Sequence, residues 1–324
     1  MPTPQQPLPS GFGIHTTARE AIAGHDLKGR TMIVTGGYSG LGLEATRAFV
    51  ELGARVIVPA RTRAKAQDNL SGLDVEIEDL DLFDPASIDA FASRFLASGR
   101  PLHALVNSAG IMAPPLERDA RGFEPQLATN HLGHFQLTMR LWPALVAAGG
   151  ARVISVSSRG HRFGSVDFED PMFEKRPYEK WKAYGQSKSA NVLFAVGLDR
   201  RAEAQRVRAF ALHPGVILTD LSRHMSDDDF KMMGAMRAPD GKLVALNPAA
   251  MKTPEQGAAT IAWCAVSSQL DGKGGVYCED CDIAIAVPAD APTGSGVRPW
   301  AIDPALAEKL WTASEAWTGV AFPG

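Results

Sequence analysis

The sequence TMIVTGGYSGLGLEATRAFV, residues 31–50, begins with a short apolar run, continues into a glycine-rich turn and ends in an apolar pattern of helical spacing. A strand, a glycine turn and a helix in this order form the phosphate-binding unit of dinucleotide folds. The glycines let the backbone approach a pyrophosphate, and the helix N-terminus offers free N–H groups. Gly36, Gly40 and Gly42 have the spacing G-x-x-x-G-x-G rather than the commoner G-x-G-x-x-G. Because most glycine clusters are only turns, the prediction of nucleotide binding depends on the flanking strand and helix.

Length and composition are those of a globular protein with no strong charge bias. The chain has 324 residues and a formal net charge of -3, which gives no reason to expect a nucleic-acid partner or an anionic membrane surface. The first ten residues, MPTPQQPLPS, lack the basic flank and apolar core of a signal peptide. No apolar run approaches membrane-spanning length, so we expect a cytoplasmic protein without a membrane span.

The three cysteines, Cys264, Cys278 and Cys281, are too few for a disulfide framework and fit a reducing compartment. Cys278 and Cys281 have C-x-x-C spacing. A zinc site would need a second pair of ligands nearby, and a redox motif would be expected just before a helix, whereas this pair follows an apparent strand. The sequence therefore favours ordinary core cysteines and no metal site.

Apolar runs and helical patterns alternate along the chain. The patterns predict strands at 32–34, 55–60, 73–78, 102–106, 152–156, 207–212 and 275–277. They predict helices at 16–24, 43–52, 84–98, 123–148 with a kink at Pro143, 184–203, 253–267 and 304–316. This order indicates an α/β fold, a doubly wound Rossmann domain with a mainly parallel seven-stranded sheet. We expect a disordered start at 1–10 within a tail and arm at 1–28, one catalytic domain at 29–324, and a mobile helical lid at 218–250.

Arg61 directly follows the second predicted strand, where this fold meets the adenosine ribose. An acidic residue there would bind the free 2′-hydroxyl of NAD, whereas an arginine can pair with the 2′-phosphate of NADP. Ser39 could add a hydroxyl to the same phosphate. The alternatives are that Arg61 is a solvated loop charge, or that Arg63 or Lys65 makes the contact instead. The sequence favours NADP(H), with NAD(H) as the second choice.

Tyr184 and Lys188 lie four residues apart on a predicted helix and so share one face. A lysine ammonium near a phenol favours the phenolate, and we expect it to lower the tyrosine pKa so that the phenol can exchange a proton with a substrate oxygen. Such a pair alone is usually a solvated helix face. Ser158 changes that interpretation, because it ends a strand just before this helix, where ligands bind in such sheets.

At this point the chain resembles the short-chain dehydrogenase/reductase family. The matching motifs occur in the family's order over most of residues 30–280: TGGYSGLG at 35–42, Asp81-Leu82, NSAG at 107–110, Asn130, SVSS at 155–158, YGQSK at 184–188 and HPGVILT at 213–219. Residue 108 is a serine, whereas the family often has an asparagine at this position. SKSANVLF at 187–194 and the long interval from Ser158 to Tyr184 are similar to the group that contains retinol dehydrogenases, WW-domain oxidoreductases and protochlorophyllide reductases.

The resemblance implies hydride transfer between a nicotinamide and a carbonyl or alcohol carbon. Tyr184 would be the general acid/base, and Ser158 would hold the substrate oxygen. Lys188 would bind the nicotinamide ribose and tune Tyr184, and Asn130 would support a water-linked proton relay, although a satisfied core amide is the alternative. Cofactor contacts would come from Gly36, Tyr38, Ser39, Gly40, Leu41, Gly42, Arg61, Asp81, Leu82, Asn107, Ala109, Gly110, Tyr184, Lys188, Pro214, Gly215, Ile217 and Thr219.

Two functions of different classes fit these motifs. The first is an enzyme acting on a small aldehyde, ketone or alcohol, with a hydrophobic substrate suggested by the methionine-rich segment 218–250. The second is a nucleotide-sensing protein that kept the fold without turnover, which the intact Ser158, Tyr184 and Lys188 disfavour. The resemblance also implies a homodimer or homotetramer.

Overall fold

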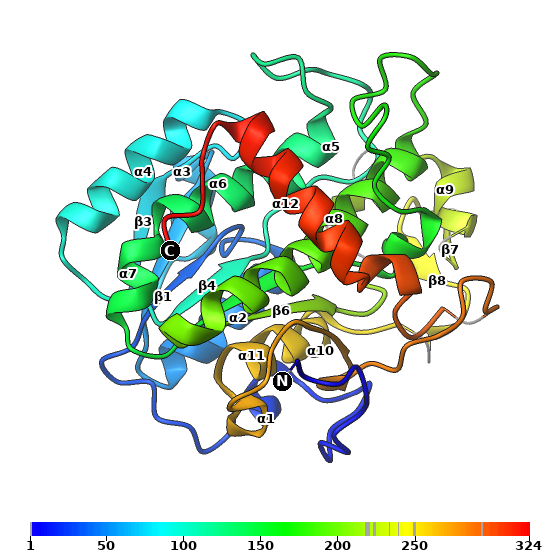
Figure 1. Ribbon diagram of the computed structural model, residues 1–324. Coiled ribbons are helices and arrows are strands. Elements are labelled where there is room, and N and C mark those ends of the chain that lie inside the picture. The colour runs from blue at the N-terminus through cyan, green and yellow to red at the C-terminus, as the bar shows by residue number, and fades with distance from the viewer. Residues whose placement is uncertain are drawn as a thin grey trace.

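The computed structural model describes residues 2–217, 221–222, 225–232, 234–238, 240–248, 251–292 and 294–324. Its centre is an eight-stranded sheet of order β10-β9-β6-β5-β4-β1-β2-β3 (Figure 1). The strands are β1 (Thr31–Val34), β2 (Arg55–Ala60), β3 (Val75–Asp79), β4 (Ala104–Asn107), β5 (Ala151–Val156), β6 (Val207–His213), β9 (Val276–Glu279) and β10 (Asp282–Ile283). All pairs are parallel except β9 with β10. The predicted doubly wound, mainly parallel fold is thus confirmed.

The count of seven strands is wrong by one, because β10 has only two residues and shows no pattern in the sequence. It forms a tight antiparallel hairpin with β9, whose turn contains Asp280 and Cys281 at φ angles of 53° and 59°. Cys278 and Cys281 therefore belong to a strand and its hairpin turn. Both thiols are buried and free, which agrees with the prediction of core cysteines.

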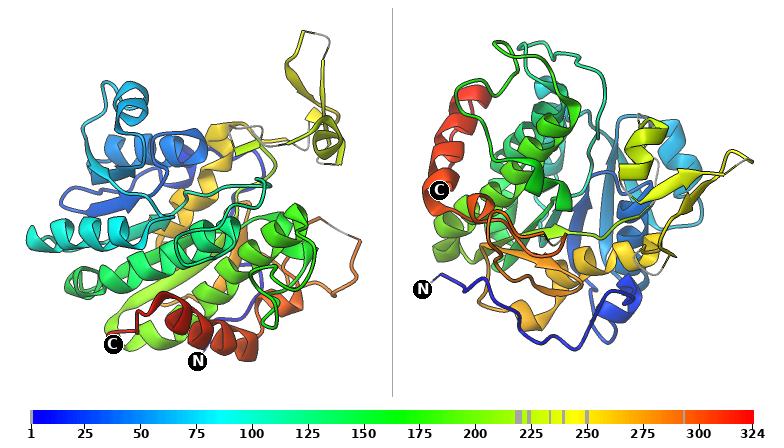
Figure 2. Two further views of the ribbon diagram at one scale, coloured as in Figure 1. Left: turned by 90° about the horizontal axis from the view of Figure 1, so that it is seen from above. Right: turned by 90° about the vertical axis from the view of Figure 1, so that its right-hand side faces the viewer.

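Helices cover both faces of the sheet (Figure 2). One face packs against α1 (Ala18–Ala21), α2 (Gly40–Glu51) and α11 (Ala259–Val266). The other face packs against α4 (Pro85–Ala97), α6 (Gly133–Arg140), α7 (Trp142–Ala147), α8 (Lys180–Ala202) and α12 (Pro304–Thr318). Three further helices are α3 (Arg63–Asn69), α5 (Pro125–Leu127) and α10 (Pro254–Gly257). The central strands are buried on both faces, as their continuous apolar sequence predicts.

The long helix expected at 123–148 is divided. A π-helical turn at Ala128–Leu132 connects α5 to α6, and the chain breaks again at Leu141 before α7. The second break confirms the kink expected at Pro143, since proline is tolerated only in the first turn of a helix. The π turn was not predicted, and it contains Asn130.

The N-terminal residues do not match the expectation of disorder at 1–10. Gln5 lies against the β9–β10 hairpin, where its side chain accepts from Tyr277 N at 2.9 Å and donates to the carbonyl oxygens of Tyr277 and Ala284. Leu8 N donates to the Asp282 carboxylate at 2.7 Å. These long-range contacts order a segment whose composition is that of a disordered tail.

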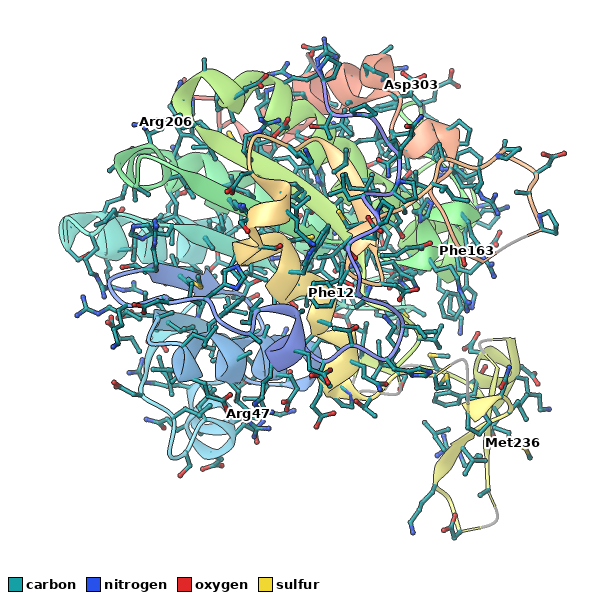
Figure 3. The ribbon with its side chains drawn as sticks, turned by 90° about the horizontal axis from the view of Figure 1, so that it is seen from below. Phe12, Arg47, Phe163, Arg206, Met236 and Asp303 are labelled. Atoms are coloured by element: carbon teal, nitrogen blue, oxygen red, sulfur yellow. The ribbon has the colours of Figure 1, made fainter. Side chains whose placement is uncertain are left out.

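Within 218–250 the described residues include α9 (Asp227–Met232) and a separate two-stranded ribbon, β7 (Ala235–Arg237) with β8 (Leu243–Ala245). The α9 helix and the ribbon project from the body of the protein, and Met236 lies on the projecting part (Figure 3). A purely helical lid is therefore wrong, because the described residues of this segment also include a β-hairpin. Its mobility stays a prediction. None of the described helices is both long and apolar enough to cross a membrane.

Candidate active site

A cavity of about 710 Å³ opens at the carboxyl ends of the parallel strands. It lies at the point where the strand order reverses, since β1 pairs with β2 on one side and with β4 on the other. Such switch points are where doubly wound sheets bind ligands. Most of the predicted site residues line this cavity: Gly36, Tyr38, Ser39, Gly40, Leu41, Gly42, Arg61, Asp81, Leu82, Ala109, Gly110, Ser158, Tyr184, Lys188, Pro214, Gly215 and Ile217.

The glycine turn between β1 and α2 is shaped for close backbone approach. Gly36 has φ 67°, and a Cβ there would lie 3.0 Å from the Cα of Ala109. A Cβ on Gly42 would lie 2.4 Å from the Gly36 carbonyl oxygen, which no side chain tolerates. Ser39 is the N-cap residue of α2, but its hydroxyl makes no capping hydrogen bond. The turn therefore offers free N–H groups at a helix N-terminus and an uncommitted hydroxyl, which fits a pyrophosphate.

Thr35 lines the cavity, and its structural role there was not predicted from the sequence. Its hydroxyl accepts from the backbone N–H groups of Ser108 and Ala109 at 2.9 and 3.0 Å and lies 2.9 Å from His134 Nε2. Burial lowers the pKa of His134 to about 4, so this imidazole stays neutral. Thr35 thus joins the end of β1 to the loop after β4. Its place at the start of the glycine motif was the available signal.

The three cations after β2 differ in their surroundings. Arg61 and Lys65 line the cavity. Arg63 instead forms an ion pair with Asp79 at 3.4 Å, and both side chains are largely exposed. Of the alternatives that the sequence left open, the geometry favours Arg61 or Lys65 for an anionic group at this end of the cavity.

Ser158, Tyr184 and Lys188 come together at the other end. Ser158 follows β5 and begins a 3₁₀ turn, η2 (Arg159–Phe163), where its Oγ accepts from Gly160 N at 2.9 Å. Tyr184 and Lys188 project from the second and third turns of α8, which starts four residues earlier than predicted. Both are buried, at 4% and 5% exposure. Lys188 Nζ donates to the Val156 carbonyl oxygen at 3.0 Å and lies 5.7 Å from the centre of the Tyr184 ring.

The expectation that Lys188 lowers the pKa of Tyr184 is wrong for this chain alone. Burial raises the pKa of Tyr184 to about 12, and a hydrogen bond with Ser158 only opposes that rise. Burial also lowers the pKa of Lys188 to about 8. Both groups are desolvated, and the ammonium donates to a carbonyl oxygen rather than to the phenol. At neutral pH the site thus presents a protonated phenol beside a lysine that is still mostly charged.

Asn130 lies behind the cavity wall rather than in it. Its Oδ1 accepts from Ile111 N at 2.9 Å, and its Nδ2 donates to Ile111 O and to Ser187 Oγ, both at 3.0 Å. A Cβ on Gly110 would lie 3.0 Å from Asn130 Oδ1 and 3.7 Å from Lys188 Nζ, so only a glycine separates the two side chains. The Asn130 amide is thus fully hydrogen-bonded in the core, which agrees with the alternative that it is a satisfied core amide. It also lies close to Lys188.

One predicted cofactor residue, Asn107, does not line the cavity. Asn107 is buried at the end of β4 with its Nδ2 3.4 Å from the Thr138 hydroxyl, so its side chain points into the protein. Thr219 lies outside the described residues. Gly215 has φ 105°, and a Cβ there would lie 2.5 Å from the Lys252 side chain, which explains the glycine of the motif.

Apolar side chains form one wall of the cavity beside Tyr184, and the sequence did not identify the individual residues. Tyr184 belongs to a cluster with Met112, Met225 and Phe230, against which Trp181 packs. Two of these residues come from the 218–250 segment, so that segment forms part of the wall. The cluster makes the Tyr184 end of the cavity suited to an apolar molecule.

Comparisons with known proteins agree with this geometry. The short chain dehydrogenase family matches residues 30–229. A Streptomyces antibioticus protein named "Probable oxidoreductase" is 45% identical over 88% of this chain and 96% of its own length. Human retinol dehydrogenase 12 is 36% identical over 89% of this chain and 86% of its own length. A solved structure of an uncharacterised Mycobacterium paratuberculosis protein has a TM-score of 0.71 at 31% identity, covering 94% of this chain and 98% of that one.

The matched family, the relatives and the arrangement of Ser158, Tyr184 and Lys188 lead to the same conclusion. The chain belongs to the short-chain dehydrogenase/reductase family and is an oxidoreductase of that family.

Proposed function

We propose that this protein reduces an aldehyde or ketone with NADPH, or oxidises the corresponding alcohol with NADP⁺, and that its substrate has an apolar body. The observation that supports this most directly is a single cavity with the glycine turn at one end and Ser158, Tyr184 and Lys188 at the other. The apolar cluster around Tyr184 supports an apolar substrate.

The glycine turn and the Ser39 hydroxyl fit a dinucleotide, which would supply the hydride when bound. Ser158 would hold and polarise the substrate oxygen. Tyr184, with a pKa of about 12, stays protonated at neutral pH and can donate its proton to that oxygen during carbonyl reduction. Lys188, close to the phenol ring, would bind the ribose and stabilise the phenolate after the proton has left. Asn130, beside Lys188, would support a proton relay that restores the phenol.

The direct test is the decrease in absorbance at 340 nm when the purified protein and NADPH meet a panel of apolar aldehydes and ketones. Turnover of any panel member by the wild-type protein, lost in Tyr184→Phe, is the expected result. The alternative function, a nucleotide sensor, predicts NADPH binding in calorimetry with no turnover of any carbonyl.

The preference for NADP(H) follows from Arg61. Its planar guanidinium can bind a 2′-phosphate with charge-assisted hydrogen bonds, each worth roughly 1.5–3 kcal/mol. Because about 1.4 kcal/mol is a factor of ten, we expect kcat/KM for NADPH to exceed that for NADH at least tenfold.

Arg61→Asp should reverse much of this preference, mainly through the KM of the cofactor. Arg63→Asp is the matched control, because Arg63 is turned toward Asp79 and should not affect the preference. Equal kcat/KM values for both cofactors in the wild-type protein would contradict the proposal. A preference that survives in Arg61→Asp would transfer the contact to Lys65.

We also infer a cytoplasmic location, supported by three free, buried cysteines that suit a reducing compartment. A homodimer or homotetramer remains a prediction from the family, which sedimentation of the purified protein would test.

A further inference from the structure

Two arginines flank the reacting end of the cavity, and no role in the proposed reaction is assigned to them. Arg159 and Arg162 both lie on the η2 turn that follows Ser158, and both line the cavity. Gly160, between them, packs directly on the catalytic phenol, since a Cβ there would lie 2.6 Å from Tyr184 Cε1. The turn therefore places the backbone of both arginines next to the point where the substrate oxygen would bind.

The two guanidinium groups approach one point. A Cβ on Gly294 would lie 3.1 Å from Arg159 Nη1 and 3.3 Å from Arg162 Nη1. Arginine stays charged at any ordinary pH, so two such groups repel each other unless an anion lies between them. The pKa of Arg162 is lowered by burial and, in addition, by the charges of Arg159 and Arg298.

No carboxylate of the described chain forms an ion pair with either arginine, although Glu279 lies near enough for the charge of Arg159 to oppose the rise in its pKa. Neither Arg159 nor Arg162 forms an ion pair or a side-chain hydrogen bond with any residue that the structure describes. Asp280 is paired with Lys252. Glu279 accepts from Gly296 N at 2.9 Å, and burial raises its pKa, which weakens it as a counter-charge.

The cofactor phosphates are unsuitable partners for these arginines. The phosphate-binding turn lies between β1 and α2, whereas η2 follows β5, and β4 separates β5 from β1 in the sheet. The surroundings of η2 are those of the substrate end, because Phe163, Trp181 and Tyr184 pack edge to face in sequence.

We infer that the substrate is an apolar aldehyde or ketone that also bears a carboxylate, which Arg159 and Arg162 bind while Ser158 and Tyr184 engage the carbonyl oxygen. This inference rests on the proposed function. Two guanidinium forks match the planar geometry of a carboxylate, and desolvation beside the apolar wall strengthens such hydrogen bonds.

The experiment compares acids with their neutral esters. With NADPH as the cofactor, kcat/KM is measured for 4-formylbenzoate and its methyl ester, and for 10-oxodecanoate and its methyl ester. We expect the wild-type protein to prefer at least one acid over its ester by tenfold or more. The double variant Arg159→Met/Arg162→Met should lower that ratio at least tenfold. Arg200→Met, which removes an exposed charge from α8, should leave the ratio unchanged and serves as the control.

A second measurement does not depend on turnover. Calorimetry of the protein with NADPH compares decanoate, decanamide and decylphosphonate. Tighter binding of decanoate than of decanamide by at least tenfold, lost in the double variant, supports the inference.

Reduction of the esters with no preference for the acids would overturn the inference and leave the proposed function standing. Equal binding of decanoate and decanamide would also overturn it, and a tenfold preference for the phosphonate would overturn the assignment to a carboxylate. If no carbonyl compound is reduced, the proposed function fails, and the calorimetry alone decides whether an anion site exists.

Discussion

Replacing Lys188 by methionine should stabilise the fold while removing function. Burial lowers the pKa of Lys188 from 10.5 to about 8, and its side chain is 5% exposed. Each pKa unit corresponds to about 1.4 kcal/mol, so the charged lysine costs about 3 kcal/mol of folding free energy at pH 7. Methionine has a similar length and no charge. The Val156 carbonyl oxygen keeps a second donor, Asn191 Nδ2 at 3.1 Å, so the substitution does not leave it unpaired.

The loss of one hydrogen bond, about 1 kcal/mol, reduces the expected gain to about 2 kcal/mol. For a domain of this size that is a rise in Tm of about 3 °C. The size of this gain in stability also depends on pH. Below pH 8 the folded lysine is charged and the full cost is present. Between pH 8 and 10.5 the unfolded chain binds more protons than the folded one, so the cost of Lys188 disappears as pH rises. The gain should therefore be about 2 kcal/mol smaller at pH 9.5 than at pH 7.

The assay is urea unfolding of both proteins at pH 7 and pH 9.5, with circular dichroism as the readout. Lys182→Met is the control, because Lys182 lies on the same helix and forms only an exposed ion pair with Glu179. Its effect should stay within about 0.5 kcal/mol. A Lys188→Met protein that is less stable than the wild type at pH 7, or whose gain is the same at both pH values, would refute the reasoning.

Four further predictions concern the site. Tyr184→Phe should lower kcat by about 10²–10⁴-fold with little change in NADPH affinity, because only the proton donor is removed; stopped-flow turnover and calorimetry together check this, and near wild-type kcat would exclude the role. The kcat/KM for NADPH should fall as pH rises through about 8, as the free enzyme's Lys188 loses its charge; a flat profile from pH 7 to 9 would contradict it. Gly42→Ala should abolish NADPH binding, since its Cβ would lie 2.4 Å from a carbonyl oxygen, whereas Gly150→Ala, with open space around it, should bind normally. Asp229→Asn should speed hydrogen exchange in α9, because Asp229 ties that helix to Lys180 and to Trp181 Nε1; unchanged exchange would show that other contacts hold it.

Much of the fold could be predicted because the relevant signals are local and repeated. The central strands are buried on both faces and so appear in the sequence as continuous apolar runs, and the kink at Pro143 follows from the missing N–H of proline. The errors occur where tertiary contacts override local preference. Residues 2–10 have a disordered composition, yet Gln5 and Leu8 are fixed by hydrogen bonds to residues more than 270 positions away. The β7–β8 ribbon and the two-residue β10 are too short for any periodic signal.

The candidate site divides in the same way. Backbone requirements such as those of Gly36 and Gly42 can be inferred from residue type, and in the structure both glycines lie at the turn between β1 and α2. The sequence could not show how deeply the Tyr184 and Lys188 side chains are buried, and burial sets the dielectric environment of both groups. A lysine four residues from a tyrosine suggests a lowered phenol pKa, but full burial of both groups shifts both pKa values toward the neutral forms instead. The same limit applies to Arg159 and Arg162, which the sequence does not mark as site residues. In the sequence they are ordinary polar residues that follow a strand. Only the folded chain shows that both guanidinium groups lie close to Gly294.

The high pKa of Tyr184 and the arginines of η2 are connected through the proposed reaction. A phenol with a pKa of about 12 is a good proton donor only if negative charge on its oxygen is stabilised once the proton leaves. Lys188, still mostly charged at pH 7, lies near enough to supply that stabilisation when the phenolate forms. The arginines of η2 add positive charge on the substrate side of the same phenol, and this charge would favour the phenolate unless a bound anion compensated it. A substrate carboxylate between Arg159 and Arg162 would remove that excess, so that burial, Lys188 and Ser158 would set the charge state of Tyr184.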